Sequence, residues 1–254
     1  MSKKWFTGPE ARFAQALQKE LLQHSMAPWH RRGAALLDIN CGDGLFLPLL
    51  WQCGFDVSGT ERSPQARTQA MQAAPKGTEI QAAAADHLPF ADKSFDWAVL
   101  HLDGTAAPDV EAAVREALRV TTRGLAVTFW NAVSLPNLLR RLTLRSMPWP
   151  GTAHAWWPIW RLLSGFSAFK MTLQSTLCGP IGSWHRQCPM APWNSSLRSL
   201  PLGAWCIIRL DLAPLRGQRG LALRLRHARL HNPEPVMEYG SSSLRQTVNK
   251  EGNS

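Results

Sequence analysis

The chain has 254 residues, 45% of them hydrophobic, which is enough for one large α/β domain with or without a small appendage. No apolar run reaches the roughly 18 to 20 residues of a membrane-spanning helix, and the first residues lack the apolar core of a signal peptide, so we expect a cytoplasmic protein. The five cysteines are odd in number and include no C-x-x-C pair, which argues against a zinc site or a disulfide framework.

The formal net charge of +10 is concentrated in the second half of the chain. Residues 1–130 carry 13 Lys and Arg against 14 Asp and Glu, whereas residues 131–254 carry 15 against 4. Seven of the 12 tryptophans also lie in the second half. We therefore expect a near-neutral first half joined to a basic, Trp-rich second half.

The first elements lead into a glycine-rich turn. Residues 9–26 have the apolar spacing of an amphipathic helix. Residues 36–50 read LLDINCGDGLFLPLL, which predicts a buried strand, a tight turn through Gly42 and Gly44, and the start of a helix. The third glycine of the dinucleotide fingerprint is missing. Asp38 and Asp43 place negative charge in this turn, which favours a cationic ligand over a pyrophosphate.

This segment resembles motif I of the class I S-adenosylmethionine-dependent methyltransferases, acid-x-G-x-G-x-G, with Asn40 at the first glycine. Asn tolerates positive φ better than most residues, so the substitution is mild. The resemblance implies a Rossmann-like fold and S-adenosylmethionine as cofactor. It also implies cofactor contacts at Asp38, Asn40, Gly42 and Gly44.

The next strand, predicted over residues 55–59, leads to Glu61. This acid lies 17 residues beyond the last glycine of the turn, near the position where nucleoside-binding folds place an acid on the ribose hydroxyls. A carboxylate can accept hydrogen bonds from both hydroxyls. Residues 60–64, TERSP, are similar to the family's acid-x-S-P, which adds Arg62 to the expected cofactor contacts.

The third strand is predicted over residues 80–84. The loop that follows it resembles the family's D-A-E-x-L-P-F string, which brackets the adenine. Its first acid is Ala84 here, and we expect Ala85 and Asp86 to take over the adenine contact. The fourth strand, residues 97–102, carries His101 at its carboxyl end, where ligands of open parallel sheets lie. We expect His101 near the cofactor, either as a general base or as a structural residue.

Helix 107–120 and strand 125–130 complete five strand-helix units, and strands over 169–177 and 204–212 provide an antiparallel pair. We therefore predict an α/β fold with a doubly wound, mostly parallel seven-stranded sheet, the Rossmann-like methyltransferase fold, with a basic, Trp-rich C-terminal elaboration. Residues 1–131 form the cofactor-binding core, 132–230 a substrate cap with the closing strands, and 231–254 a disordered tail. Residues 178–203, rich in Pro, Gly and Trp, read as an ordered loop.

The predicted function is in-line methyl transfer from S-adenosylmethionine to a small-molecule acceptor, with no metal. The basic half admits three interpretations: a cap over an acidic or aromatic acceptor, a membrane-surface helix suited to a lipid or quinone-like acceptor, or, less favoured, a nucleic-acid surface. Asn40 and Ala84 also leave open a non-catalytic methyltransferase-like binding or regulatory protein. The sequence does not indicate an oligomeric state.

Overall fold

A computed structural model describes residues 8–104, 109–142, 151–166 and 170–212. The helices are α1 (Pro9–Ser25), α2 (Leu47–Gln52), α3 (Pro64–Ala73), α4 (Val110–Val120), α5 (Leu135–Leu142), α6 (Trp156–Ser164) and α7 (Ala191–Ser195), with a 3-10 turn, η1 (Ile181–Ser183). The strands are β1 (Ala35–Ile39), β2 (Asp56–Thr60), β3 (Glu79–Gln81), β4 (Phe95–His101), β5 (Thr121–Asn131), β6 (Ala153–His154), β7 (Lys170–Thr176) and β8 (Trp205–Asp211).

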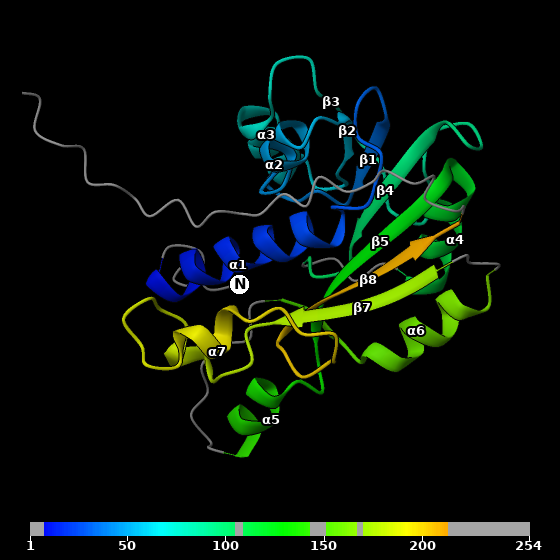
Figure 1. The fold of residues 1–254 in the computed structure, drawn as a ribbon. Coiled ribbons are helices and arrows are strands. Elements are labelled where there is room, and N and C mark those ends of the chain that lie inside the picture. The colour runs from blue at the N-terminus through cyan, green and yellow to red at the C-terminus, as the bar shows by residue number, and fades with distance from the viewer. Residues whose placement is uncertain (1–7, 105–108, 143–150, 167–169, 213–254) are drawn as a thin grey trace, which may run out of the picture. The chain divides into compact units, whose positions relative to one another are not determined.

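These strands form one sheet in the order β3-β2-β1-β4-β5-β8-β7, with β6 paired to β5 (Figure 1). Strands β1 to β5 run parallel, and β8 runs antiparallel to both of its neighbours. The chain order reverses between β1 and β4, and this reversal is the place where ligands bind in open α/β sheets. The doubly wound α/β fold and its closing antiparallel pair are confirmed. The two-residue strand β6 is an addition to the seven strands that we expected.

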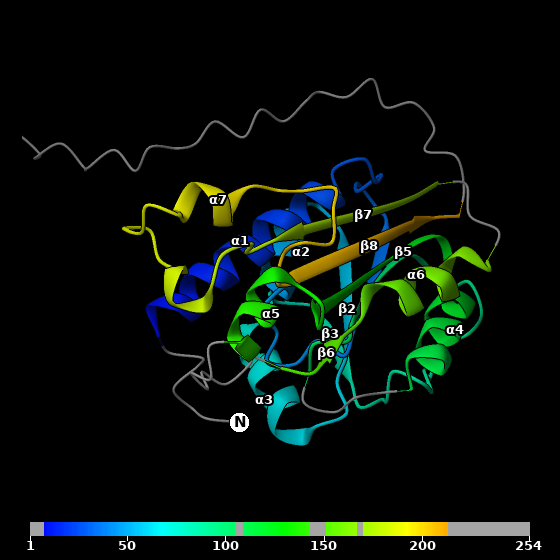
Figure 2. The same cartoon turned by 90° about the horizontal axis from the view of Figure 1, so that it is seen from below.

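Helices cover both faces of the sheet (Figure 2). One core cluster joins α1 and α2 to side chains such as Leu36 and Val99, and the other joins α4 and α6 to Leu37 and Leu100. Neighbouring residues of β1 and β4 thus enter opposite clusters, as the alternation of side chains along a strand requires. Because both faces are covered, these central strands are apolar on both sides.

Three local differences from the predicted elements have physical causes. Strand β5 begins directly after α4 instead of after a loop, because the Thr121 amide caps the helix by donating to Leu118 O. Gly124 therefore lies inside the strand, where an added Cβ would approach Leu210 O to 2.6 Å. The predicted loop 178–203 also contains η1 and α7, which are too short to show a periodic pattern.

The first helix is tied to the last strand by buried polar contacts. Trp29 Nε1 donates to Asp211 Oδ1 over 2.9 Å, and the Arg209 guanidinium donates to the carbonyl of Ser25. Trp29 also stacks on Trp97 of β4 with ring centroids 4.4 Å apart. All five cysteines are free, with Cys41, Cys178 and Cys206 buried.

Several predictions concern residues outside the described part of the chain. These are the tail 231–254, residues 213–230 of the predicted segment 132–230, and residues 107–108 of the predicted helix 107–120. None of the helices that the structure describes is both long enough and apolar enough to cross a membrane.

Candidate functional site

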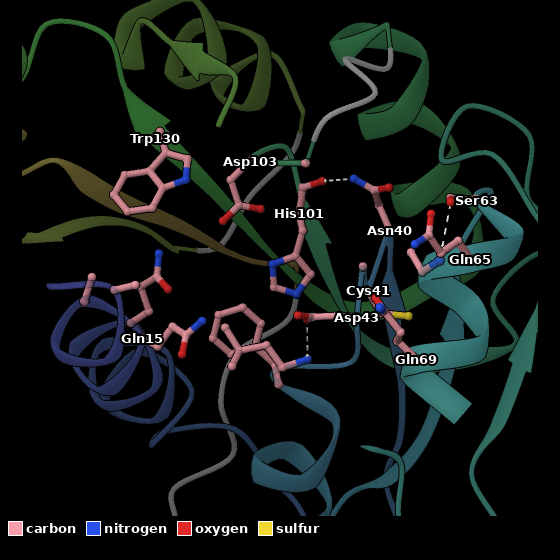
Figure 3. A pocket seen from close by; sticks show the side chains of 18 residues that line it. Gln15, Asn40, Cys41, Asp43, Ser63, Gln65, Gln69, His101, Asp103 and Trp130 are labelled. Atoms are coloured by element: carbon pink, nitrogen blue, oxygen red, sulfur yellow. Dashed lines mark hydrogen bonds between the residues drawn. The ribbon is translucent and has the colours of Figure 1, made fainter. Parts of the chain in front are cut away.

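A cavity of about 600 Å³ opens at the carboxyl ends of β1 and β4, where the strand order reverses. Its size lies within the range of small-ligand sites. In Figure 3, Gln15 and Trp130 lie on one side of the cavity and Ser63, Gln65 and Gln69 on the other. The described residues that line it are Ala11, Ala14, Gln15, Gln18, Asn40, Cys41, Gly42, Asp43, Leu45, Phe46, Ser63, Gln65, Ala66, Gln69, His101, Asp103, Gly104 and Trp130.

The turn after β1 has the left-handed backbone that its sequence suggested. Asn40 adopts φ 59° and Gly42 φ 60°, so Asn40 takes the conformation that a motif glycine would take. Its side chain supports this turn, because Nδ2 donates to the carbonyl of His101 at 2.7 Å. An added Cβ on Gly42 would meet no atom within 4 Å, which leaves the backbone at this position open.

Gly44 has a packing role that we did not anticipate. Its φ is 83°, and an added Cβ would lie 2.9 Å from Ala70 Cα of α3. Gly44 does not line the cavity. The glycine therefore allows the turn to pack directly against α3, and the structure offers no support for a contact between Gly44 and a ligand.

Glu61 is buried beside the turn, and its carboxylate is held by main-chain donors. Oε2 accepts from the Gly42 amide at 2.9 Å and Oε1 from the Ser63 amide at 2.8 Å. A carboxylate has about four lone-pair sites, so each oxygen keeps the capacity to accept another hydrogen bond. The side chain is thus oriented by the same turn that shapes the cavity.

Asp38, His101 and Thr128 form a buried chain of polar groups across three strands. His101 Nε2 lies 2.7 Å from Asp38 Oδ1, and its Nδ1 lies 2.7 Å from Thr128 Oγ1. Asp38 lies behind His101 rather than in the cavity lining, and its Oδ2 is buried with no hydrogen-bond partner in the described part of the chain. Both imidazole nitrogens are therefore occupied by protein groups.

The charge of His101 is set by this environment. Burial lowers its pKa, but the Asp38 charge, the hydrogen bond that the ring donates to Asp38 and the Asp103 charge raise it, and the net pKa lies above the ordinary imidazole value. A ring with both nitrogens paired to protein groups is poorly placed to accept a proton from a substrate. The geometry thus favours a positioning role for His101, and the general-base role stays a prediction.

Aromatic rings surround the imidazole. Phe46 stacks on His101 with centroids 4.9 Å apart and also on Trp205 at 6.0 Å. Trp205 Nε1 donates to Asp103 Oδ2 at 3.0 Å, which fixes one carboxylate oxygen at the cavity edge. Burial, followed by the charges of Asp38 and Glu61, raises the pKa of the Cys41 thiol, so this lining cysteine stays neutral.

Six residues expected to contact the cofactor do not line the cavity: Asp38, Gly44 and Glu61, which border the turn, and Arg62, Ala85 and Asp86, which lie elsewhere. Arg62 is exposed, Ala85 packs into the second core cluster, and Asp86 is exposed. A short bridge between Ala84 and His87 folds this segment back on itself, which directs it away from the cavity. The loop is held from behind by Arg119, which donates to Leu88 O and Phe90 O, so the family-like string has a structural role here.

Glutamines that sequence reasoning did not single out contribute much of the polar lining. Gln15 and Gln18 come from α1, and Gln65 and Gln69 from α3, at helical spacings that place each pair on one face. This spacing was the available signal. Helix α1 therefore lines the cavity as well as packing against the sheet. No group of three or more His, Cys, Asp or Glu among the described residues is placed to hold a metal ion.

The fold and cavity define an α/β protein with a ligand-sized site at the reversal of strand order. Residues 37–128 match the family model described as "Methyltransferase domain". A search of curated proteins gave no significant match.

Solved structures share the fold at low sequence identity. A Thermotoga maritima SAM-dependent methyltransferase, described as a possible histamine N-methyltransferase, aligns with TM-score 0.63 and 18% identity over 83% of this chain and 94% of its own. Magnesium protoporphyrin IX methyltransferase from Synechocystis, solved with bound SAH, aligns with TM-score 0.57 and 14% identity over 83% and 92%. A SAM-dependent methyltransferase from Archaeoglobus fulgidus gives 0.56 and 15% over 80% and 97%.

The domain match over residues 37–128 and the shared fold make the chain similar to S-adenosylmethionine-dependent methyltransferases.

Proposed function

We propose that the cavity at the ends of β1 and β4 binds S-adenosylmethionine and delivers its methyl group to a small-molecule acceptor. The charge of the cavity is the observation that carries this proposal. Its described lining contains the carboxylates of Asp43 and Asp103 and no Lys or Arg. Such a lining suits the sulfonium and ammonium of this cofactor and opposes the pyrophosphate of a dinucleotide.

The residues around the cavity fit the parts of the cofactor. Glu61 has free acceptor capacity for the ribose hydroxyls, and the open backbone at Gly42 permits close approach. The Oδ2 atom of Asp38 is buried without a hydrogen-bond partner among the described residues. This carboxylate, which lies behind the turn beside His101, favours positive charge there. Cofactor roles for Arg62, Ala85 and Asp86 receive no such support.

When bound, the cofactor supplies an activated methyl group, so the protein need only position the acceptor and exclude water. Asp103 and Trp130 are the groups that we assign to the acceptor side, because they lie away from the Ser63, Gln65 and Gln69 end of the cavity (Figure 3). The indole of Trp130 favours an aromatic acceptor, whereas the neighbouring carboxylate of Asp103 disfavours an acidic one.

The Glu61→Gln variant tests this assignment. Loss of one acceptor oxygen should weaken S-adenosylhomocysteine binding about tenfold or more, because hydrogen bonds to charged groups contribute roughly 1.5–3 kcal/mol. Glu79→Gln, an exposed change on β3, is the matched control and should bind like the wild type. Isothermal titration calorimetry measures both variants. Equal affinities for Glu61→Gln and the control would contradict the ribose role.

A further inference from the structure

The surface beside α5 presents apolar side chains to solvent. Leu135 and Leu138 of α5 are 40% and 44% exposed, and Leu200 and Leu202 of the segment before β8 are 58% and 43% exposed. The two segments are adjacent, since the Leu135 amide donates to Leu202 O at 3.0 Å (Figures 1 and 2). We call these four residues the leucine patch.

Helix α5 buries Pro136 and Asn137 and presents Leu135 and Leu138 to solvent. Asn137 is buried and donates to Ala132 O at 2.6 Å, whereas Leu135 and Leu138, three residues apart, point outward. Arg141 continues the same outward face and is exposed. An ordinary surface helix buries its leucines, so this arrangement indicates that the leucines have a partner outside the described chain.

The charge around the leucine patch points to an anionic partner. Residues 131–210 contain no Asp or Glu and eight Lys or Arg. Near the patch, Arg141 is exposed, and Arg198 lies 4.0 Å from the ring of Trp193, which is itself 43% exposed. Leucines flanked by Arg and Trp, in a stretch of sequence without Asp or Glu, have the composition of segments that rest in the headgroup region of a bilayer.

We propose that the leucine patch docks this protein on the surface of an anionic phospholipid bilayer. The leucines would enter the boundary between headgroups and acyl chains, and Arg141 would lie at the level of the phosphates. A nucleic acid offers no apolar layer for four leucines, which is why lipid is the better occupant. This docking does not depend on the proposed methyl transfer.

The leucine patch is linked to a wall of the cavity. The Asn131 side chain donates to Pro201 O at 2.8 Å, between Leu200 and Leu202, and the preceding residue, Trp130, lines the cavity. A docked protein would thus hold this wall close to the lipid. That position suits collection of an acceptor that dissolves in the bilayer.

Vesicle sedimentation of the full chain tests the docking. Vesicles of phosphatidylcholine with an equal part of phosphatidylglycerol should bind the protein, and phosphatidylcholine alone should not. Binding should weaken at high salt, because exposed charges are screened. The double variant Leu138→Ser/Leu200→Ser and the variant Arg141→Glu should each lower affinity about tenfold or more.

Matched controls are Trp51→Ser/Met71→Ser, two exposed apolar residues of α2 and α3, and Lys76→Glu, an exposed cation after α3. Circular dichroism checks the fold of each variant. If the leucine variant fails to fold, Arg141→Glu still tests the proposal, because it alters only an exposed side chain. The proposal would be overturned if the wild type did not bind anionic vesicles, or if the patch variants bound them as well as their controls do. It would also be overturned if the wild type were a dimer and the leucine variant a monomer that still bound vesicles, because the patch would then be a dimer interface.

Discussion

At the scale of single residues, His101 shows how context decides chemistry. A histidine at the end of a parallel strand suggested a general base near the cofactor. In the fold, both ring nitrogens are paired to Asp38 and Thr128, and Phe46 stacks on the ring. The residue is thus a fixed part of the cavity wall, held by Asp38 and Thr128.

A pH dependence of stability follows from His101. Its pKa is raised in the folded protein, so the folded state binds this proton more tightly than the unfolded state. The stabilisation is complete below pH about 6.5, the unfolded value, and is lost as pH rises through the higher folded pKa. Urea unfolding across pH 5–9 should show a decline on the alkaline side that His101→Gln lacks. An identical pH profile in the variant would contradict the assignment.

The sequence predicted part of the site and missed the rest for identifiable reasons. Asn40, Gly42 and His101 line the cavity and could be singled out because they lie at a strand end or in a turn with a strong local pattern, and their cofactor contacts stay predictions. The family-like string through Ala85 and Asp86 was equally visible, but a local bridge turns it away from the cavity. The lining glutamines of α1 and α3 depend on how distant helices pack, which no local pattern specifies.

At the scale of elements, the contact between the glycine turn and α3 is set by Gly44. Gly44→Ala would combine positive-φ strain with a Cβ 2.9 Å from Ala70 Cα. We expect a loss of about 3 kcal/mol in the free energy of unfolding, from strain plus overpacking.

Gly77→Ala is the matched control for this change. Gly77 has φ 89° and no atom within 4 Å of an added Cβ, so only the strain term of about 1 kcal/mol applies. Chemical denaturation measures both variants. Equal losses of unfolding free energy in the two variants would show that the contact between Gly44 and α3 does not contribute to stability.

The positions of the longer helices and strands followed from sequence more fully than those of the short elements did. The strands β1, β2, β4, β7 and β8 were expected within a few residues, because their apolar patterns are strong. The pairing of β6 with β5 rests on two residues, Ala153 and His154, whose sequence carries no strand signal. Its formation depends on the distant position of β5.

At the scale of the whole molecule, the ends of the described fold are joined by Asp211. This buried carboxylate accepts from Trp29 Nε1 and lies 3.2 Å from the Arg209 guanidinium. Asp211→Ala would leave the buried Arg209 without its counter-charge and should cost about 3 kcal/mol or more. Asp92→Ala removes the exposed partner of Arg119 and should cost below about 1 kcal/mol. Similar urea midpoints for the two variants would contradict this account.

The central claim is that the acidic cavity binds S-adenosylmethionine. Calorimetric titration of the full chain with S-adenosylmethionine, S-adenosylhomocysteine and NADH tests it most directly. We expect saturable binding of both sulfur compounds at one site and no binding of NADH, because Asp43 and Asp103 oppose a pyrophosphate. Binding of NADH, or no binding of either sulfur compound, would contradict the account.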